Sequence, residues 1–542
     1  MAAEARTAGQ TPVAEAGLHV SHLPTPAWQR LLGHPPVIAG LVTAAGALLW
    51  IIAFPRIGTD LSAAVARAGW ATKHPTDGYL FSWYGGFHPA GYSMLAPYVL
   101  GFAGIYLAMT VAAVLSAVLL ATLLARHGAT RPRAAAVWVA VAGWTELSAG
   151  RAAFTLGLAA GLSCVAVVDA GLCQPHQFRK ARISGSVNLA AAGALALLCC
   201  LLSPVAAVFL LVVAGALAFG RHVGHAIVVA VAAILPLGLM AVFSDGGVQP
   251  LLVQNWVPPL AAAIAVFLLV PPEWRLVRVG AIGYGIGVLV ACAVPTLIGS
   301  NVARLGELLA GPIVVGIGSS RRRWLLGLAL AAAAIWQVAQ PIADLEQGNS
   351  PPYEPQTAAL VRELGVLHAD TARVEAVPQY GHWESQELAS VVPLARGWER
   401  QLDMERNPLF YRGVLTPAAY YAWLRSNAVG YVATSTTTPD PAAVAEAATV
   451  RAGQPWLVSI WHNASWQLYR VVGSTPLASA PATIVSSTPV QITLRMSRAG
   501  TTIVRVHWSA LLSADGAVIS KAGPWTRLTA RRAGIYELQG RY

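Results

Sequence analysis

Long apolar stretches with few or no charged side chains recur from about residue 37 to residue 341, and they constrain this chain more than any other feature. A membrane-spanning helix needs roughly 17 to 25 mostly apolar residues. The sequence holds about eleven such runs, some of them short: 37–55, 99–125, 134–150, 152–172, 187–203, 205–220, 226–243, 258–271, 279–298, 308–318 and 324–341. Only 11% of the residues are charged, against about 25% in ordinary soluble proteins. We therefore predict a multi-pass α-helical membrane protein with about 11 transmembrane helices.

The basic side chains between these runs indicate how the chain crosses the membrane. Loops rich in Lys and Arg lie on the cytoplasmic side. When the gaps between runs are numbered in chain order, from the gap after 37–55, the even-numbered gaps hold twelve basic residues. The odd-numbered gaps hold five. We therefore expect a cytoplasmic N-terminal tail, residues 1–36, and an extracytoplasmic C-terminal domain, in a plasma (inner) membrane protein. The formal net charge of +12 is then spread over membrane-flanking gaps and the C-terminal part, and we predict no nucleic-acid partner.

The chain becomes polar and mixed after about residue 345, so the transmembrane core is expected to cover residues 37–344, with a first outer loop at 56–97. Residues 345–475 predict an extracytoplasmic α/β domain, with helices at 355–365 and 416–427 and strands at 374–377, 429–433 and 466–472. Residues 476–542 alternate apolar and polar side chains and predict a β-rich, sandwich-like module. The whole of 350–542 is long enough to bury its own core, so we expect it to fold as a separate soluble unit.

Asp60 is the first candidate for chemistry. It begins the stretch 60–70, whose apolar residues have helical spacing, so we expect an amphipathic helix lying at the membrane interface. A carboxylate there can act as a general base toward a sugar hydroxyl or hold a divalent cation, Mg²⁺ or Mn²⁺, with Asp77 as a second possible ligand. The alternatives are an acid placed at a helix N-terminus for the helix dipole and, for Asp77, an ordinary turn residue.

Arg304 is the second candidate, because it lies where a predicted span meets the outer surface. Its guanidinium is suited to bidentate contact with a phosphate, and Asn301 lies one turn before it. The alternative is an interfacial ion pair between Arg304 and Glu307. A further pair, Glu146 with Arg151, flanks the tight outer turn between the third and fourth runs, where mutual pairing is the favoured interpretation.

The aromatic end of the first outer loop, residues 79–92, offers a third group of candidates. Trp83 and Tyr84 are suited to stacking against a sugar, and His88 to binding a substrate or an anion. The alternative is that they anchor the loop at the membrane interface. Together with Asp60 and Arg304 they predict one interfacial cavity.

On these features the chain resembles the GT-C fold glycosyltransferases, the multi-span enzymes that move a sugar from a polyprenyl-phosphate carrier. An acid soon after the first span, a long first outer loop and a C-terminal outer domain carry the resemblance. It is also similar to uncharacterised bacterial integral membrane proteins that have Asn-x-x-Arg-Leu-Gly before a short span, here 301–306, and outer-domain stretches such as 382–384 and 393–400. Many GT-C proteins have two acids close together in the first loop, whereas Asp60 stands alone here and Asp77 is well removed.

The resemblance implies an inverting transfer to a glycan or protein acceptor in the cell envelope. Asp60 would deprotonate the acceptor hydroxyl, and Arg304 or a metal would stabilise the departing carrier phosphate. Two alternatives from other classes are a transporter or flippase of a lipid-linked or small substrate, and a non-catalytic envelope scaffold with a carbohydrate-binding outer domain.

Overall fold

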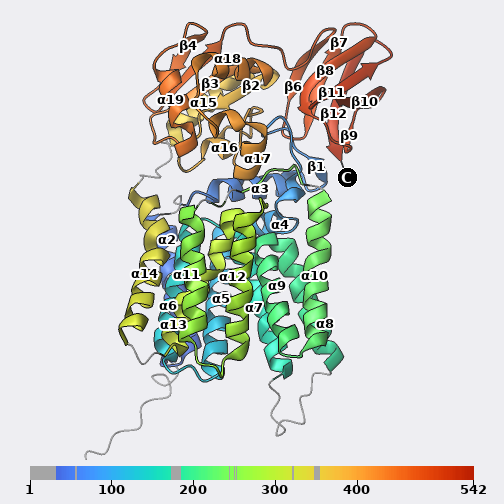
Figure 1. Ribbon diagram of the computed structural model, residues 1–542. Coiled ribbons are helices and arrows are strands. Elements are labelled where there is room, and N and C mark those ends of the chain that lie inside the picture. The colour runs from blue at the N-terminus through green and yellow to red at the C-terminus, as the bar shows by residue number, and fades with distance from the viewer. Residues whose placement is uncertain are drawn as a thin grey trace, which may run out of the picture.

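A bundle of helices carries a mixed C-terminal domain on one of its ends, as Figure 1 shows. This computed structural model describes residues 32–54, 58–172, 185–242, 244–249, 251, 253–319, 323–346 and 354–541. The expected tail up to residue 31, the basic gap 173–184 and the linker 347–353 lie outside the described residues.

Each apolar run corresponds to a helix of the bundle. These are α2 (Pro35–Ala53), α4 (Ala96–Ala103), α5 (Ile105–Arg126), α6 (Pro132–Ser148), α7 (Ala152–Leu172), α8 (Gly185–Leu202), α9 (Pro204–Phe219), α10 (Val223–Val242), α11 (Val253–Leu269), α12 (Arg275–Ala293), α13 (Ala303–Ile317) and α14 (Arg323–Glu346). Within the described part of the chain, seven are long and apolar enough to cross a membrane: α2, α5, α7, α8, α10, α12 and α14. The predicted class, a multi-pass helical membrane protein with a C-terminal α/β and β-rich region, is confirmed. The count of about eleven spans stays a prediction.

One predicted run, residues 99–125, is divided in the structure. Gly104 has a φ of +85°, a left-handed conformation that helical residues do not adopt, and it separates α4 from α5. The short α4 therefore lies at the end of the bundle near the C-terminal domain and packs on α3 (Leu61–Lys73).

The end of the bundle away from the C-terminal domain carries basic side chains. Arg131 donates from Nη1 to the carbonyl oxygen of Val315, 3.0 Å away, near the last turn of α13. Arg278 donates from Nε to the carbonyl oxygen of Phe267, 3.1 Å away. The predicted orientation, in which that end faces the cytoplasm, stays a prediction.

The first part of the C-terminal domain, the α/β unit (residues 354–472), has a four-stranded sheet in the order β2-β3-β5-β4, with β2 parallel to β3 and the other pairs antiparallel. Its strands are β2 (Arg373–Ala376), β3 (Val429–Ser435), β4 (Leu457–His462) and β5 (Trp466–Val471). Its helices are α15 (Glu354–Val366), α16 (Glu384–Glu387), α17 (Arg400–Arg406), α18 (Pro417–Ser426) and α19 (Val444–Arg451). As expected, Thr416 caps α18 by accepting a hydrogen bond from the Ala419 N–H, 3.2 Å away.

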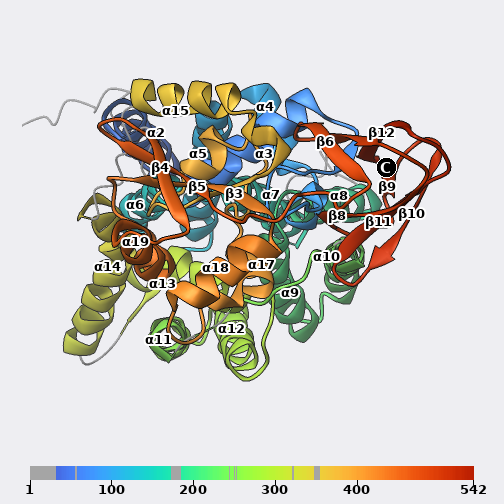
Figure 2. The same cartoon turned by 90° about the horizontal axis from the view of Figure 1, so that it is seen from above.

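The second part, the β-module (residues 476–541), consists of two sheets that enclose a common apolar core. Its strands are β6 (Ala482–Ser487), β7 (Gln491–Met496), β8 (Gly500–His507), β9 (Leu512–Ser513), β10 (Ala517–Ala522), β11 (Trp525–Ala530) and β12 (Gly534–Arg541). Seen from above, the α/β unit covers the bundle and the β-module lies at its edge, near α8 and α10 (Figure 2).

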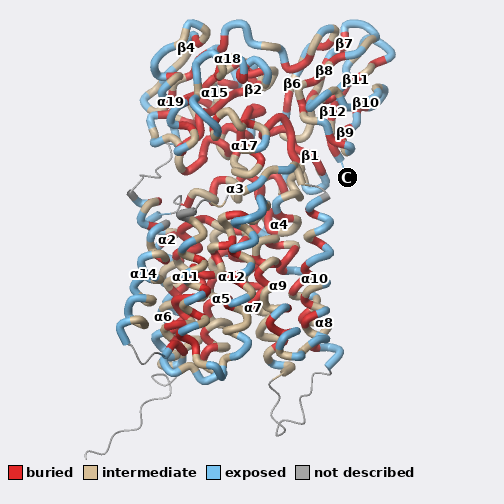
Figure 3. The backbone as a smooth tube through the Cα atoms, viewed as in Figure 1, coloured by how far each residue is buried: buried red, intermediate tan, exposed pale blue. Residues whose placement is uncertain are grey.

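The first outer loop is built into the C-terminal domain. Its strand β1 (Asp77–Tyr79) pairs with β12, and Tyr79 and Phe81 belong to the core of the β-module. Trp83, fully buried, belongs to the core of the α/β unit and donates from Nε1 to the Ser385 carbonyl oxygen, 2.8 Å away. Figure 3 shows the buried backbone running from this loop into both parts.

These contacts change the expectation that residues 350–542 fold alone. Without the loop, that fragment would lose large aromatic side chains from two cores, each worth about 3 to 5 kcal/mol when truncated to alanine. We expect the fragment to lack near-ultraviolet circular dichroism and to be digested rapidly. A peptide of residues 74–92 added in trans should restore both properties, and the same peptide with Tyr79→Ala and Trp83→Ala should not. Protease resistance and near-ultraviolet circular dichroism of the fragment without any peptide would restore the original expectation.

Candidate active site

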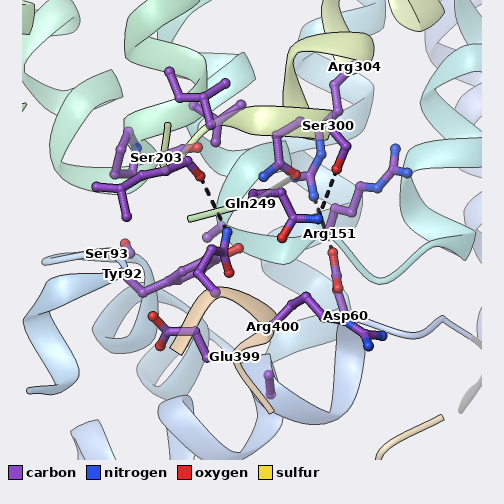
Figure 4. A pocket seen from close by; sticks show the side chains of 18 of the residues that line it. Asp60, Tyr92, Ser93, Arg151, Ser203, Gln249, Ser300, Arg304, Glu399 and Arg400 are labelled. Carbon is purple, nitrogen blue, oxygen red and sulfur yellow. Dashed lines mark hydrogen bonds and ion pairs between the residues drawn. The ribbon is translucent and has the colours of Figure 1, made fainter. Parts of the chain in front are cut away.

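A cavity of about 870 Å³ lies between the bundle and the α/β unit. Its wall comes from α3, the segment 91–100, the starts of α7 and α9, the end of α10, the segment 296–307, α14 and the segment 398–401. Figure 4 shows charged side chains from these separate segments around one hollow. The cavity therefore depends on both the membrane part and the C-terminal domain.

Asp60 and Arg304, 244 residues apart in the sequence, meet in this cavity. Arg304 Nη2 lies 3.3 Å from Asp60 Oδ2. The Asp60 side chain is 33% exposed and that of Arg304 is 11% exposed, so the carboxylate is the more accessible of the two. Asp60 occupies the N-cap position of α3, but its side chain accepts no capping hydrogen bond. The structure thus places the carboxylate toward the arginine and not on its own helix end.

A tight turn between α6 and α7 holds the start of α3 in place. Gly150 has a φ of +73°, and a Cβ there would lie 2.6 Å from the backbone nitrogen of Leu61. The Asp60 N–H donates to the Ala149 carbonyl oxygen, 3.4 Å away. Only glycine permits so close an approach, and this contact fixes where Asp60 enters the cavity.

Arg151 is a second arginine in the wall. Its Nη1 lies 2.6 Å from Glu146 Oε1 and 3.4 Å from Glu307 Oε2. The predicted pairing of Glu146 with Arg151 is therefore present. The alternative pairing of Arg304 with Glu307 is not, because Glu307 faces Arg151 and Arg304 faces Asp60.

The C-terminal domain supplies the other side of the cavity through Trp398, Glu399 and Arg400. Trp398 donates from Nε1 to the Thr59 carbonyl oxygen, 2.7 Å away and directly before Asp60. Glu399 forms an ion pair with Arg67 of α3. These contacts tie the α/β unit to the helix that carries Asp60.

Behind this wall lies a buried histidine. His382 stacks on Trp398 with ring centroids 3.4 Å apart. Its Nε2 lies 3.2 Å from Asp440 Oδ2, and its Nδ1 lies 3.5 Å from Glu384 Oε1. Arg400 donates to the same Asp440 from Nη2 over 2.8 Å. Burial alone would lower the pKa of His382, but the two carboxylates outweigh it and hold this pKa above its usual value.

Because the pKa of His382 is higher in the folded than in the unfolded state, its contribution to stability is full below about pH 6.5 and is lost as the pH rises through the raised pKa. We therefore expect the C-terminal domain to unfold at a lower temperature as the pH is raised through that range. His382→Gln should weaken this dependence, whereas the exposed His462→Gln should leave it unchanged. Tryptophan fluorescence during thermal unfolding measures both. Identical pH profiles for the His382→Gln and wild-type proteins would contradict the assignment.

The remaining predicted site residues divide into two groups. Asn301 lines the cavity, in the 3₁₀ helix η2 (Gly299–Val302) before α13. Trp83, Tyr84 and His88 are not among its lining residues. The expected aromatic wall is therefore corrected: only Gly91 and Tyr92 of this stretch reach the cavity, because the earlier aromatic residues fill the cores of the α/β unit and the β-module.

His88 instead joins three distant segments. Its Nδ1 lies 2.9 Å from Asp245 Oδ1, and its Nε2 lies 2.8 Å from Ser509 Oγ. Asp245 follows α10 and Ser509 follows β8, so this histidine connects the first loop, the bundle and the β-module. Tyr84 has a comparable role, since its hydroxyl accepts a hydrogen bond from the Glu399 N–H over 2.9 Å.

The predicted metal site does not fit the residues present. Asp77 lies in β1 with its carboxylate 3.9 Å from His74 Nδ1, and it does not line the cavity. Among the described residues, no group of three or more His, Cys, Asp or Glu side chains is arranged to hold a metal ion. Asp60 has an arginine, not a second carboxylate, as its near partner, and this donor set does not suit Mg²⁺ or Mn²⁺.

Sequence reasoning missed Arg67, Glu399 and Arg400. The signal for Arg67 was available, because it lies seven residues after Asp60 on the same helix. Residues 60, 63, 64 and 67 all line the cavity, which is the spacing of one helix face. Glu399 and Arg400 lie in the stretch 393–400 that carries part of the family resemblance, but no spacing rule pointed to the cavity.

No family model matches the chain, and no curated protein matches it. Among solved structures, the oligosaccharyltransferase of Archaeoglobus fulgidus in the apo form has a TM-score of 0.44 at 13% identity, covering 76% of this chain and 70% of that chain. The same enzyme tethered to an acceptor peptide with the NVT sequon has a TM-score of 0.45 at 12% identity, with the same coverage. ArnT from Cupriavidus metallidurans, bound to undecaprenyl phosphate, has a TM-score of 0.36 at 13% identity, covering 80% of this chain and 98% of that chain.

The chain is similar to GT-C fold membrane glycosyltransferases. This is the class that the sequence resembles. At TM-scores below 0.5 and identities of 12–13%, the likeness carries no argument about activity.

Proposed function

We propose that this protein is a membrane glycosyltransferase that moves a sugar from a polyprenyl-phosphate carrier to an acceptor on the side of the C-terminal domain. The observation that carries the proposal is the meeting of Asp60 and Arg304 in one cavity at the end of the bundle. A base and a phosphate-binding cation are the two groups that such a transfer needs.

The walls of the cavity suit a substrate with an apolar and an anionic part. Val205 and Val208 of α9 and Leu237 and Met240 of α10 form an apolar side. Arg304, Arg67, Arg151 and Arg400 line the same cavity and form its cationic side. The lipid chain of the carrier would pack against the apolar side, while its phosphate contacts the arginines.

In the proposed reaction, Asp60 accepts the proton of the acceptor hydroxyl while the hydroxyl oxygen attacks the anomeric carbon of the sugar. The bond from that carbon to the carrier phosphate oxygen breaks, and its electron pair stays on the phosphate, where Arg304 stabilises the added charge. Attack opposite the leaving phosphate inverts the anomeric configuration. No step requires a metal ion.

The ion pair between Asp60 and Arg304 then describes the resting state. The phosphodiester of the donor offers two non-bridging oxygens to the planar guanidinium fork, whereas Arg304 contacts Asp60 through the single pair Nη2–Oδ2 at 3.3 Å. Binding of the carrier would displace Asp60 from Arg304 and leave its carboxylate free to accept a proton. The base would thus become available only when the donor is in place.

The direct test is a transfer assay with the full-length protein in lipid nanodiscs, supplied with a radiolabelled polyprenyl-phosphate sugar. Release of free polyprenyl phosphate that depends on an added envelope glycan or protein acceptor supports the proposal. Binding of the carrier without release would favour the transporter or the scaffold. Uptake of the carrier across the bilayer of proteoliposomes would separate the transporter from the scaffold.

A further inference from the structure

The β-module is strongly basic, and its charge is concentrated at one end. Residues 476–542 contain eight basic and two acidic residues, so this module carries a formal net charge of +6, half of the total of +12. The α/β unit beside it, residues 354–472, has nine basic and eleven acidic residues. The positive charge is thus a property of this module and not of the C-terminal domain as a whole.

Four arginines lie at the end of the β-module away from the bundle: Arg495, Arg498, Arg531 and Arg532. We call them the arginine tip. The strand register places them together, because Gly534 pairs with Met496 and Ala530 pairs with Gly500, so the turns 497–499 and 531–533 are neighbours. The other end of β12 pairs with β1 of the first loop, next to the bundle.

The arginine tip is exposed and held on ordered turns. All four arginines are exposed, and none takes part in the ion pairs found among the described residues. The Tyr536 hydroxyl donates to the Arg532 carbonyl oxygen over 3.0 Å, and Ser497 Oγ donates to the Pro481 carbonyl oxygen over 3.0 Å. The guanidinium groups therefore extend from fixed turns, which reduces the entropy lost when they bind.

Two acidic residues lie nearby but do not cancel this charge. Asp515 precedes β10, whose first residue Ala517 pairs with Ala530 at the same end. Glu537 lies on β12 opposite Thr493. Exposed arginines without an ionic partner repel one another, and natural selection for solubility alone does not require such a cluster.

From this arrangement we propose that the arginine tip is a docking surface for an anionic polysaccharide, one that carries phosphate or carboxylate groups along its chain. Planar guanidinium forks match such groups in bidentate geometry. A lipid surface is disfavoured, because the tip is at the end of the module that faces away from the bundle. Nucleic acid is disfavoured, because the module's exposed tryptophan, Trp508, follows β8 at the opposite end and offers the tip no stacking surface.

The test compares two triple variants of the full-length protein in neutral nanodiscs. One carries Arg498→Gln, Arg531→Gln and Arg532→Gln. The matched control carries Arg362→Gln, Arg412→Gln and Arg470→Gln, which remove the same charge from exposed positions of the α/β unit. The probes are polygalacturonate, poly(glycerol phosphate) and neutral dextran of the same length, measured by fluorescence polarisation between 50 and 200 mM NaCl.

We expect the wild-type and control proteins to bind both anionic polymers, with affinity that falls as salt rises, and to ignore dextran. The tip variant should bind them about tenfold more weakly, with a shallower salt dependence. Equal loss in both triple variants would overturn the proposal, as would equal binding of dextran. Tighter binding of duplex DNA, or capture by anionic vesicles through the same arginines, would also overturn it. Because no transfer is measured, failure here leaves the proposed enzyme untouched.

Discussion

Replacement of Asp60 by asparagine is expected to lower the rate of sugar transfer by roughly 10² or more, the scale for loss of a general base. Asparagine has the same shape and keeps the oxygen that faces Arg304 Nη2 at 3.3 Å, but it cannot accept the acceptor's proton. The carrier should still bind, and slightly more tightly, because Arg304 no longer has to leave a carboxylate. We therefore expect a fall in kcat with an unchanged or lower KM for the carrier.

The matched control for this experiment is Asp77→Asn, which makes the same chemical change in the same loop. Asp77 lies in β1 outside the cavity, so its variant should transfer at the wild-type rate. Radiolabelled transfer in nanodiscs measures both variants, and near-ultraviolet circular dichroism checks that each is folded. Full activity of the Asp60→Asn protein would show that Asp60 is not the general base. The transporter or the scaffold would then be favoured.

The sequence was a good guide wherever one local rule decides the structure. Apolar runs of sufficient length become helices because the bilayer leaves the backbone no other way to satisfy its polar groups. The α/β unit and the β-module were also foreseen, since Thr416 before Pro417 starts a helix and the alternation at 525–530 makes a strand.

The meeting of Asp60 with Arg304 was foreseen for a different reason. The charge pattern predicts that both lie at the same face of the membrane, which confines them to one plane. Helix packing then has to bring two positions together within that plane, not in the whole volume of the protein. What could not be foreseen is that they face each other as an ion pair, because this depends on the turn at Gly150 against Leu61.

The aromatic loop shows where such reasoning stops. Trp83, Tyr84 and Phe87 have the composition of a membrane-interface anchor or a sugar-stacking surface, and the sequence gives no sign of a third possibility. They fill the core of a domain that begins more than 250 residues later. Whether these side chains become an anchor, a stacking surface or a core depends on the long-range packing of α3 and the loop against the α/β unit. The local periodicity of the sequence does not indicate this packing.

Replacement of Arg304 by lysine is expected to weaken carrier binding more than it slows the chemical step, because the positive charge that stabilises the leaving phosphate is kept. Lysine keeps the positive charge but loses the planar fork, so one of the two phosphate contacts disappears. A hydrogen bond to a charged group is worth about 1.5 to 3 kcal/mol, which corresponds to a roughly tenfold to hundredfold rise in KM for the polyprenyl-phosphate donor. The shorter reach of its single amino group should also leave Asp60 less tightly paired in the resting state.

The control for Arg304→Lys is Arg278→Lys, at the end of the bundle away from the cavity, where Arg278 donates to the Phe267 carbonyl oxygen and lies over the Phe267 ring. It should leave both kinetic constants unchanged while making the same substitution in a membrane helix. Initial rates over a range of donor concentrations separate KM from kcat for each variant. The two cavity variants then form a pair with opposite signatures, a kcat loss for Asp60→Asn and a KM rise for Arg304→Lys. If both variants lost kcat equally with KM unchanged, the arginine would not hold the carrier phosphate in the ground state, and its proposed role would be wrong.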